Sequence, residues 1–191
     1  MKCFLSLALV ASVGLASATS LTLKMVADDF FEAYISTSDA VQGTQFAAQV
    51  NTWQAGTVTG TVALTPGMTN YLHIRARDVF GAPSMIVGEA SLSDAGFAFG
   101  NLTQNLLTNT TDWQVSLSGF GSGYVTPTLI GFNGGGPWGT QSGISLNAAR
   151  IWSNQTAGEH YFTTAIRVVP EPASLLAFAL GGLLVLRRKS K

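Results

Sequence analysis

The sequence is poor in cysteine. Its one cysteine, Cys3, lies at the very start of the 191 residues. The rest of the chain therefore has no thiols for a disulfide framework or a thiolate metal site, and no catalytic thiol. The fold must be held together by its apolar core and its hydrogen bonds.

Charged side chains are also scarce, at 10% of the residues. The formal net charge of the whole chain is zero, but the charges are unevenly distributed. Residues 19–168 carry five basic and nine acidic side chains, so their net charge is five minus nine, or −4, while four basic side chains gather after residue 186. The acidic part contains no basic stripe or patch, so we do not expect nucleic acid as a partner.

The first 18 residues have the three parts of a secretory signal peptide. Lys2 supplies positive charge, residues 4–16 form a mostly apolar run, and Ala16 and Ala18 are the small side chains that signal peptidase requires. The alternative is a buried helix that begins the fold. We expect cleavage after Ala18, which removes Cys3 and leaves the exported chain without cysteine.

The last segment, 169–191, has the composition of a membrane anchor. Pro170 and Pro172 prevent a helix from continuing out of the preceding strand. An uncharged, largely apolar run follows at 173–186, and the chain ends on basic residues. As a helix this run extends about 21 Å, and with its flanking residues about 27 Å, close to the roughly 30 Å hydrocarbon core of a bilayer. A basic end fits the cytoplasmic side, so the sequence predicts a C-terminal transmembrane helix.

The order of features in this tail resembles the PEP-CTERM sorting signal of Gram-negative bacteria. A Pro-Glu-Pro motif, an apolar run with a Gly-Gly pair and a basic end follow one another, and the motif residues are Pro170, Glu171, Pro172, Arg187, Arg188 and Lys189. The resemblance implies export, transient retention in the inner membrane and cleavage near the motif by an exosortase. It also implies a final location at the cell surface or in the extracellular matrix. An ordinary tail anchor is the alternative.

Residues 19–168 are expected to form one β-sandwich domain. Apolar and polar residues alternate with the period of two that a half-buried strand requires. The alternating runs are 21–25, 31–35, 58–64, 71–77, 113–117 and 161–168. Turns rich in Gly and Pro separate them. Many short strands without a long helical pattern predict an all-β, jelly-roll-like sandwich between the two terminal helices.

The same domain resembles galactose-binding-like jelly rolls. The likeness rests on residues 27–35, Trp53, residues 62–67 and residues 71–76. Such modules accompany secreted glycosidases and surface proteins, and many of them bind sugars. The resemblance therefore implies a jelly-roll fold, but it supplies no diagnostic ligand residues.

Trp138 is the residue that we expect to contact a ligand. It follows the glycine-rich stretch 134–137, and a loop with so few side chains cannot by itself cover an indole ring. The ring either folds back on the sandwich or stacks on a sugar, with Asn133 and Gln141 as sources of hydrogen bonds. Trp53, beside another turn, is a second candidate.

Asp28, Asp29 and Glu32 form the densest group of carboxylates in the sequence. Calcium binds such oxygen ligands, and a plain turn between two strands is the alternative explanation. No other cofactor is expected. His73 and His160 lack the spacing of zinc ligands, so we expect both to be surface residues rather than metal ligands or catalytic bases.

These features predict a non-enzymatic, exported protein of the cell surface or extracellular matrix. Its partners would be signal peptidase and an exosortase during processing, the membrane while the tail is retained, and extracellular polysaccharide. A secreted hydrolase of matrix glycans is the alternative, and it would need paired carboxylates in one cleft, with Glu32, Glu89 or Glu159 beside an aspartate. A purely structural matrix component is the third possibility.

The exported protein should begin at Thr19, because Ala16 and Ala18 meet the requirement of signal peptidase for small side chains. N-terminal sequencing of the exported protein checks this. A mature chain that begins upstream of Ser17 would show that the apolar start belongs to the fold.

Overall fold

The computed structural model describes residues 18–156 and 158–170. The signal-peptide helix and the transmembrane helix that we expect at the two ends fall outside these residues. No helix among the described residues is long and apolar enough to cross a membrane.

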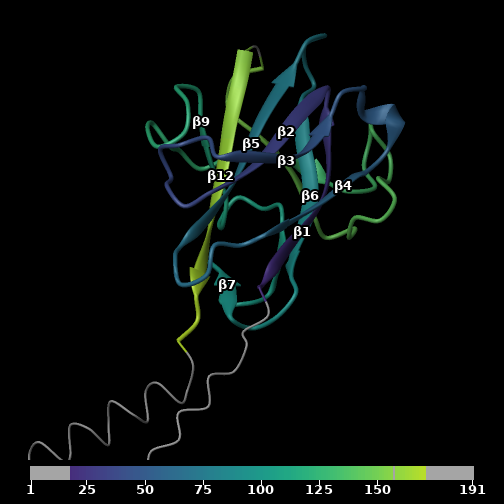
Figure 1. Ribbon diagram of the computed structural model, residues 1–191. Coiled ribbons are helices and arrows are strands. Elements are labelled where there is room, and N and C mark those ends of the chain that lie inside the picture. Colours follow the sequence, from purple (N-terminus) through teal and green to yellow (C-terminus); the bar gives the residue numbers. More distant parts are fainter. Residues whose placement is uncertain (1–17, 157, 171–191) are drawn as a thin grey trace, which may run out of the picture.

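Two antiparallel sheets pack face to face as a sandwich, which confirms the all-β prediction (Figure 1). Sheet A contains, in spatial order, β10 (Thr128–Phe132), β11 (Ala149–Trp152), β6 (Met85–Leu92), β1 (Ser20–Asp28) and β4 (Val58–Ala63), with β8 (Asn105–Leu107) paired to β6. Sheet B contains β3 (Thr44–Gln49), β2 (Phe30–Ser36), β5 (Asn70–Asp78), β12 (Gly158–Val168) and β7 (Phe97–Phe99), with β9 (Gln114–Ser116) paired to β12. A short 3-10 helix, η1, spans Trp53–Ala55.

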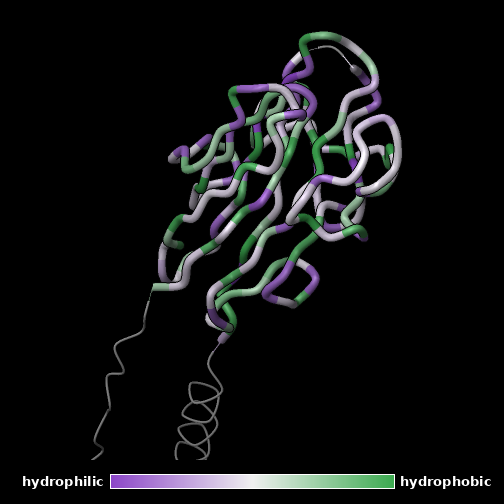
Figure 2. Tube along the Cα trace, turned by 90° about the vertical axis from the view of Figure 1, so that its right-hand side faces the viewer, coloured by the Kyte–Doolittle hydropathy of each residue, from purple (hydrophilic) through white to green (hydrophobic). Residues whose placement is uncertain are grey.

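Side chains that alternate inward from both sheets form the main core. Leu21 and Leu23 of β1 meet Leu72 and Ile74 of β5 in one cluster, and all four are almost completely buried. In Figure 2 the apolar residues follow the strands through the body of the molecule. Each of the six predicted alternating runs overlaps a strand of the structure, namely β1, β2, β4, β5, β9 and β12.

Sheet A carries a second, smaller core on its outer face. Val26 of β1 and Val87 of β6 are buried there together with three residues of the segment 133–148, which are Trp138, Ile144 and Ala148. The segment 133–148 therefore forms a partial third layer over sheet A.

Trp138 is held in this layer by a hydrogen bond and a cation–π contact. Its indole N–H donates to Oδ2 of Asp28 at 2.7 Å, and the guanidinium carbon of Arg150 lies 5.1 Å from the centre of the ring. Arg150 is itself buried and donates to the main-chain oxygens of Gly135 and Gly139. These contacts fold the glycine-rich loop back on the sandwich.

The strands run between two ends of the sandwich. β1 starts and β12 ends at the same end, which we call the tail end, and the opposite end is the distal end (Figure 1). The N–H of Val169 donates to the carbonyl of Gly96 at 2.9 Å. Main-chain hydrogen bonding of the sandwich therefore continues to the residue before Pro170.

Asp28 should make the stability of the protein fall with rising pH. Burial raises its pKa from 3.8 to about 7, against the lowering effect of the Trp138 hydrogen bond. Between about pH 4 and about pH 7 the folded protein thus holds a proton that the unfolded chain has released, so the free energy of unfolding decreases across this window and levels off above it. The melting temperature of Asp28→Asn, relative to the unmodified protein, should therefore rise between about pH 5 and about pH 8.

His73 and His160 make the free energy of unfolding rise with pH instead, because burial lowers the pKa of both imidazoles. Their contribution is present in both proteins, so the difference in melting temperature isolates Asp28. If the difference in melting temperature between the two proteins does not change with pH, the Asp28 carboxyl titrates as it does in water.

Candidate functional site

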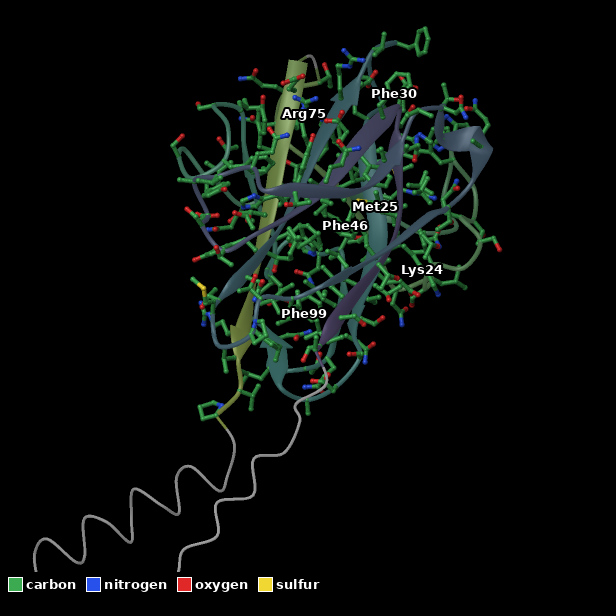
Figure 3. The ribbon with its side chains drawn as sticks, viewed as in Figure 1. Lys24, Met25, Phe30, Phe46, Arg75 and Phe99 are labelled. Atoms are coloured by element: carbon green, nitrogen blue, oxygen red, sulfur yellow. The ribbon has the colours of Figure 1, made fainter. Side chains whose placement is uncertain are left out.

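The outer face of sheet B carries an array of polar and aromatic side chains. Side chains alternate between the two faces of a strand, so the register of neighbouring strands decides which of them meet. Across β2, β5 and β12 the register forms two adjacent rows, with Glu32, Arg75 and Tyr161 in one and Phe30, Arg77 and Glu159 in the other. Figure 3 shows Arg75 and Phe30 toward the distal end.

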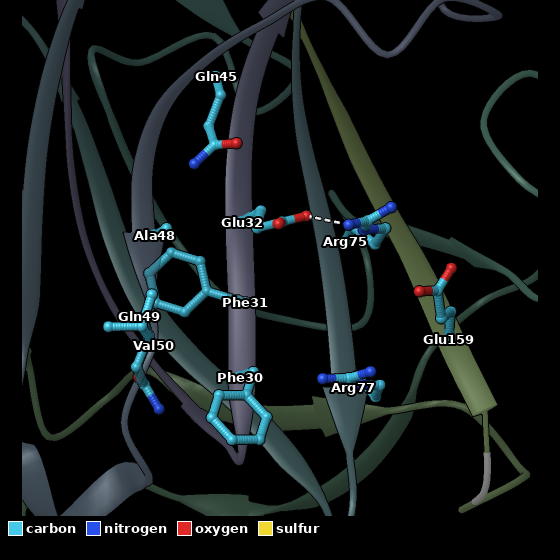
Figure 4. A pocket seen from close by; sticks show the side chains of 10 residues that line it. All are labelled: Phe30, Phe31, Glu32, Gln45, Ala48, Gln49, Val50, Arg75, Arg77 and Glu159. Atoms are coloured by element: carbon cyan, nitrogen blue, oxygen red, sulfur yellow. Dashed lines mark ion pairs between the residues drawn. The ribbon is translucent and has the colours of Figure 1, made fainter.

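Glu32 and Arg75 form an ion pair at the centre of this array (Figure 4). Nη2 of Arg75 lies 2.6 Å from Oε2 of Glu32, and the hydroxyl of Tyr34 donates to the same oxygen at 2.6 Å. Burial, and next the Glu32 carboxylate, raise the pKa of Tyr34 to about 12. Both side chains of the ion pair are about one third exposed, so the pair contributes only about 0–1 kcal/mol to stability. Its main effect is to fix the orientation of two planar polar groups.

A hollow of about 350 Å³ opens beside this ion pair, within the roughly 300–1,000 Å³ range of ligand pockets. Strands β2, β3, β5 and β12 all contribute side chains to it (Figure 4). Besides the ion pair, its lining includes Phe30, Gln45, Arg77 and Glu159. The hollow thus combines carboxylates, guanidinium groups, an amide and an aromatic ring.

Two contacts hold the side chains at the distal side of this hollow. The hydroxyl of Tyr161 donates to Oε2 of Glu159 at 2.6 Å, and the guanidinium carbon of Arg77 lies 5.6 Å from the ring centre of Phe30. Arg77 makes no ion pair with any of the described residues. Its N–H groups are therefore available to a ligand.

His73 lies in the next row toward the tail end, and our prediction that it is a surface residue is wrong. The ring of Phe120 stacks on it at 4.1 Å and 9°, and Nε2 of His73 lies 3.5 Å from Oδ1 of Asp39. The hydroxyl of Tyr124 donates to this oxygen at 3.1 Å. The polar face of β5 was identified correctly, but two loops cover it at this point. Beyond them a second hollow, of about 290 Å³, is lined by residues that include Tyr71.

His160 is also fully buried, against our prediction. Its ring faces the core, 4.4 Å from the ring of Trp152, and its Nε2 lies 3.1 Å from the carbonyl oxygen of Gln155. β12 begins at Gly158, so the alternation that turns Phe162 inward turns His160 inward as well. Neither histidine is placed as a surface ligand.

The tryptophan site that we expected for a ligand is closed. Trp138 is 4% exposed in the second core, so its face is not free to stack on a sugar. Asn133 is buried and donates to the carbonyls of Gln141 and Ile144, while its own side-chain oxygen accepts from the N–H of Gln141. Trp53 packs, half-buried, against the same core. Trp138 and Asn133 build the third layer, so their burial contradicts the ligand site predicted at these two residues, while a ligand contact at Trp53 stays a prediction.

The three carboxylates proposed for calcium do not all converge, because Glu32 lies apart from Asp28 and Asp29. Asp28 accepts from Trp138, and Oδ2 of Asp29 accepts from the N–H of Val79 at 3.0 Å. Glu32 lies on the outer face of sheet B with Arg75. The described part of the chain contains no group of three or more His, Cys, Asp or Glu side chains that could hold a metal ion. The three suggested calcium ligands are therefore not brought together in the described residues.

Sequence reasoning missed most of the hollow. Glu32 was considered as a metal ligand and as one carboxylate of a possible hydrolase, Phe30 only as part of the stretch 27–35, and Gln45 not at all. A signal was present in the outward positions of the alternating runs, where Arg75 and Tyr161 stand. It became a site only through the register that aligns strands far apart in the sequence.

Comparison with known proteins identifies the tail. Residues 168–189 match the model of the PEP-CTERM protein-sorting motif. No curated protein and no solved structure matches the chain, so the likeness of the sandwich to galactose-binding-like jelly rolls rests on the sequence alone. The match begins at Val168, the last residue of β12. The chain thus carries a PEP-CTERM sorting signal, which directs export and membrane-anchored processing by an exosortase in Gram-negative bacteria.

Proposed function

We propose that this protein is a non-catalytic component of the cell surface or extracellular matrix that binds polysaccharide on the outer face of sheet B. The hollow around the Glu32–Arg75 ion pair is the observation that carries the proposal. The sorting signal supports it, since it directs the chain out of the cytoplasm. Signal peptidase would release the N-terminus, and the membrane would hold the chain until the tail is cleaved.

The chemistry of the hollow suits sugar hydroxyls, which both donate and accept hydrogen bonds. Glu32 offers acceptor oxygens, Arg77 offers donors, and the amide of Gln45 offers both. Phe30 in the hollow and Tyr161 beside it provide apolar ring surface of the kind that covers the C–H face of a sugar. A few fixed polar groups beside apolar surface are typical of ligand sites.

The charges in the hollow favour an uncharged polysaccharide. Two arginines and two glutamates line it, namely Arg75, Arg77, Glu32 and Glu159. Their formal charges cancel, so the hollow has no net attraction for a highly anionic or cationic polymer. Specificity would then depend on hydrogen-bond geometry.

A glycan hydrolase remains the second candidate because Glu32 and Glu159 line the same hollow. Glu89 does not join them, since it lies on sheet A with Lys24 at 3.0 Å. Glu32 is engaged by both Arg75 and Tyr34, and Glu159 is engaged by Tyr161. Carboxylates held in this way favour binding over proton transfer to a leaving group.

Replacing Arg75 with alanine should weaken binding of polysaccharide extracted from the matrix of the producing bacterium. The variant loses planar donors and releases Glu32, and we expect roughly a tenfold loss of affinity, about 1.4 kcal/mol. Isothermal titration against the extracted polymer measures this. Lys24→Ala is the matched control, because it breaks a comparably exposed ion pair with Glu89 on the opposite sheet, and its affinity should be unchanged.

If Arg75→Ala and Lys24→Ala lose affinity to the same extent, the polysaccharide does not bind on the outer face of sheet B. Shortened chains after incubation with the unmodified protein would instead establish the hydrolase. If the polymer is neither bound nor cleaved, the protein is a structural component of the matrix.

A further inference from the structure

The tail end of the sandwich is formed by three described segments, 64–69, 93–104 and 168–170. Main-chain N–H groups connect these segments to β6, to the start of β1 and to each other, with Leu64 donating to Thr19, Leu92 to Gln104 and Val169 to Gly96. Figure 1 shows β7 near the point where β12 ends, and Figure 3 shows Phe99 of β7 in this region.

This end combines exposed apolar side chains with little charge. Leu102 is 83% exposed, and Met68, Val168 and Val169 are 48%, 40% and 39% exposed. Asp94 is the one charged side chain in the three segments. Its carboxylate accepts from the hydroxyl of Thr19 and from the N–H of Gly96, and these bonds lower its pKa. The end therefore presents apolar surface that the sandwich itself does not cover.

Leu102 has an unfavourable backbone as well as an exposed side chain. Its φ is 63°, and no other non-glycine residue in the described part of the chain has a positive φ. Glycine or asparagine adopts this conformation at lower cost than leucine. Two main-chain hydrogen bonds close the turn: the N–H of Leu102 donates to the carbonyl of Phe99, and the N–H of Phe99 donates to the carbonyl of Thr103. Strained residues of this kind cluster at sites where a protein makes functional contacts.

We propose that the tail end of the sandwich docks on the lipid bilayer through Leu102 while the sorting tail is held there. The sorting motif begins at Val168, and the apolar run begins at Ala173. From Val169 to Ala173 a fully extended chain reaches at most about 14 Å. The sandwich is therefore kept close to the membrane with this end facing it.

The bilayer fits this surface better than a protein partner of complementary charge does. Leu102 and Met68 have the chemistry of the acyl region, and the exposed Arg167 beside Val168 can meet lipid phosphates. So small an apolar contact gives weak, reversible binding. Docking therefore depends on the tail and ends when the tail is cleaved. It does not depend on polysaccharide binding, which uses a different face.

Site-specific fluorescence in vesicles tests the proposal. The full-length chain, with Cys3→Ser, is reconstituted into vesicles of phosphatidylethanolamine and phosphatidylglycerol after an environment-sensitive dye is attached at Leu102→Cys. The control is Phe80→Cys, because Phe80 is 80% exposed and follows β5 at the distal end. At residue 102 the emission should shift to the blue, rise severalfold and be quenched by lipids with a spin label on the acyl chain. At residue 80 it should show none of these changes.

A second variant separates docking from folding. Leu102→Asn should leave the melting temperature unchanged or higher, since asparagine tolerates this backbone and exposes no apolar side chain. In a chain labelled at Met68→Cys, the same replacement should reduce quenching by the spin-labelled lipids. An aqueous spectrum at residue 102, equal quenching at residues 102 and 80, or unchanged quenching at residue 68 would each overturn the proposal.

Discussion

The hydrogen bonding of β12 is the constraint on which the rest of the molecule depends. This strand pairs with β5 from Gly158 to Ile166 and with β9 and β7 along its other edge. It turns Phe162 into the core and Tyr161 to the outer face beside the hollow, and its last residue, Val168, begins the sorting motif. Since β12 is the last strand of the described residues, sheet B is complete only after residues 19–168 have all emerged. The same pairing that completes the sheet therefore fixes where the tail leaves it.

The strands that could be predicted from the sequence are those with one face in the core and one face toward solvent. β5 is an example, because Leu72 and Ile74 alternate with polar neighbours. β6 escaped prediction because Met85, Ile86 and Val87 are all buried. One face of β6 meets the main core, and the segment 133–148 covers the other. A strand covered on both faces loses its period of two, and nothing in the local sequence indicates that a distant loop will cover it.

The site was harder to predict than the fold, because its side chains meet through pairing between distant segments. Glu32 and Arg75 stand opposite each other only in the register of β2 and β5. The same limitation explains the error at Trp138, where the composition of the loop indicated an exposed ring. The partner that buries it, Asp28, lies 110 residues earlier in the chain. The tail was predictable because a sorting signal is read in linear order and needs no tertiary contact.

The length of β12 sets the distance between the hollow and the tail. From Glu159, at the hollow, to Val168, at the start of the sorting motif, the strand extends about 30 Å at about 3.3 Å per residue. A flexible linker would let this distance vary, but here main-chain hydrogen bonding continues to Val169. The side chains that line the hollow therefore stay well away from a bilayer that meets the tail end. A polymer that lies across β2, β5 and β12 can then bind while the chain is still anchored, and the sandwich itself serves as the spacer.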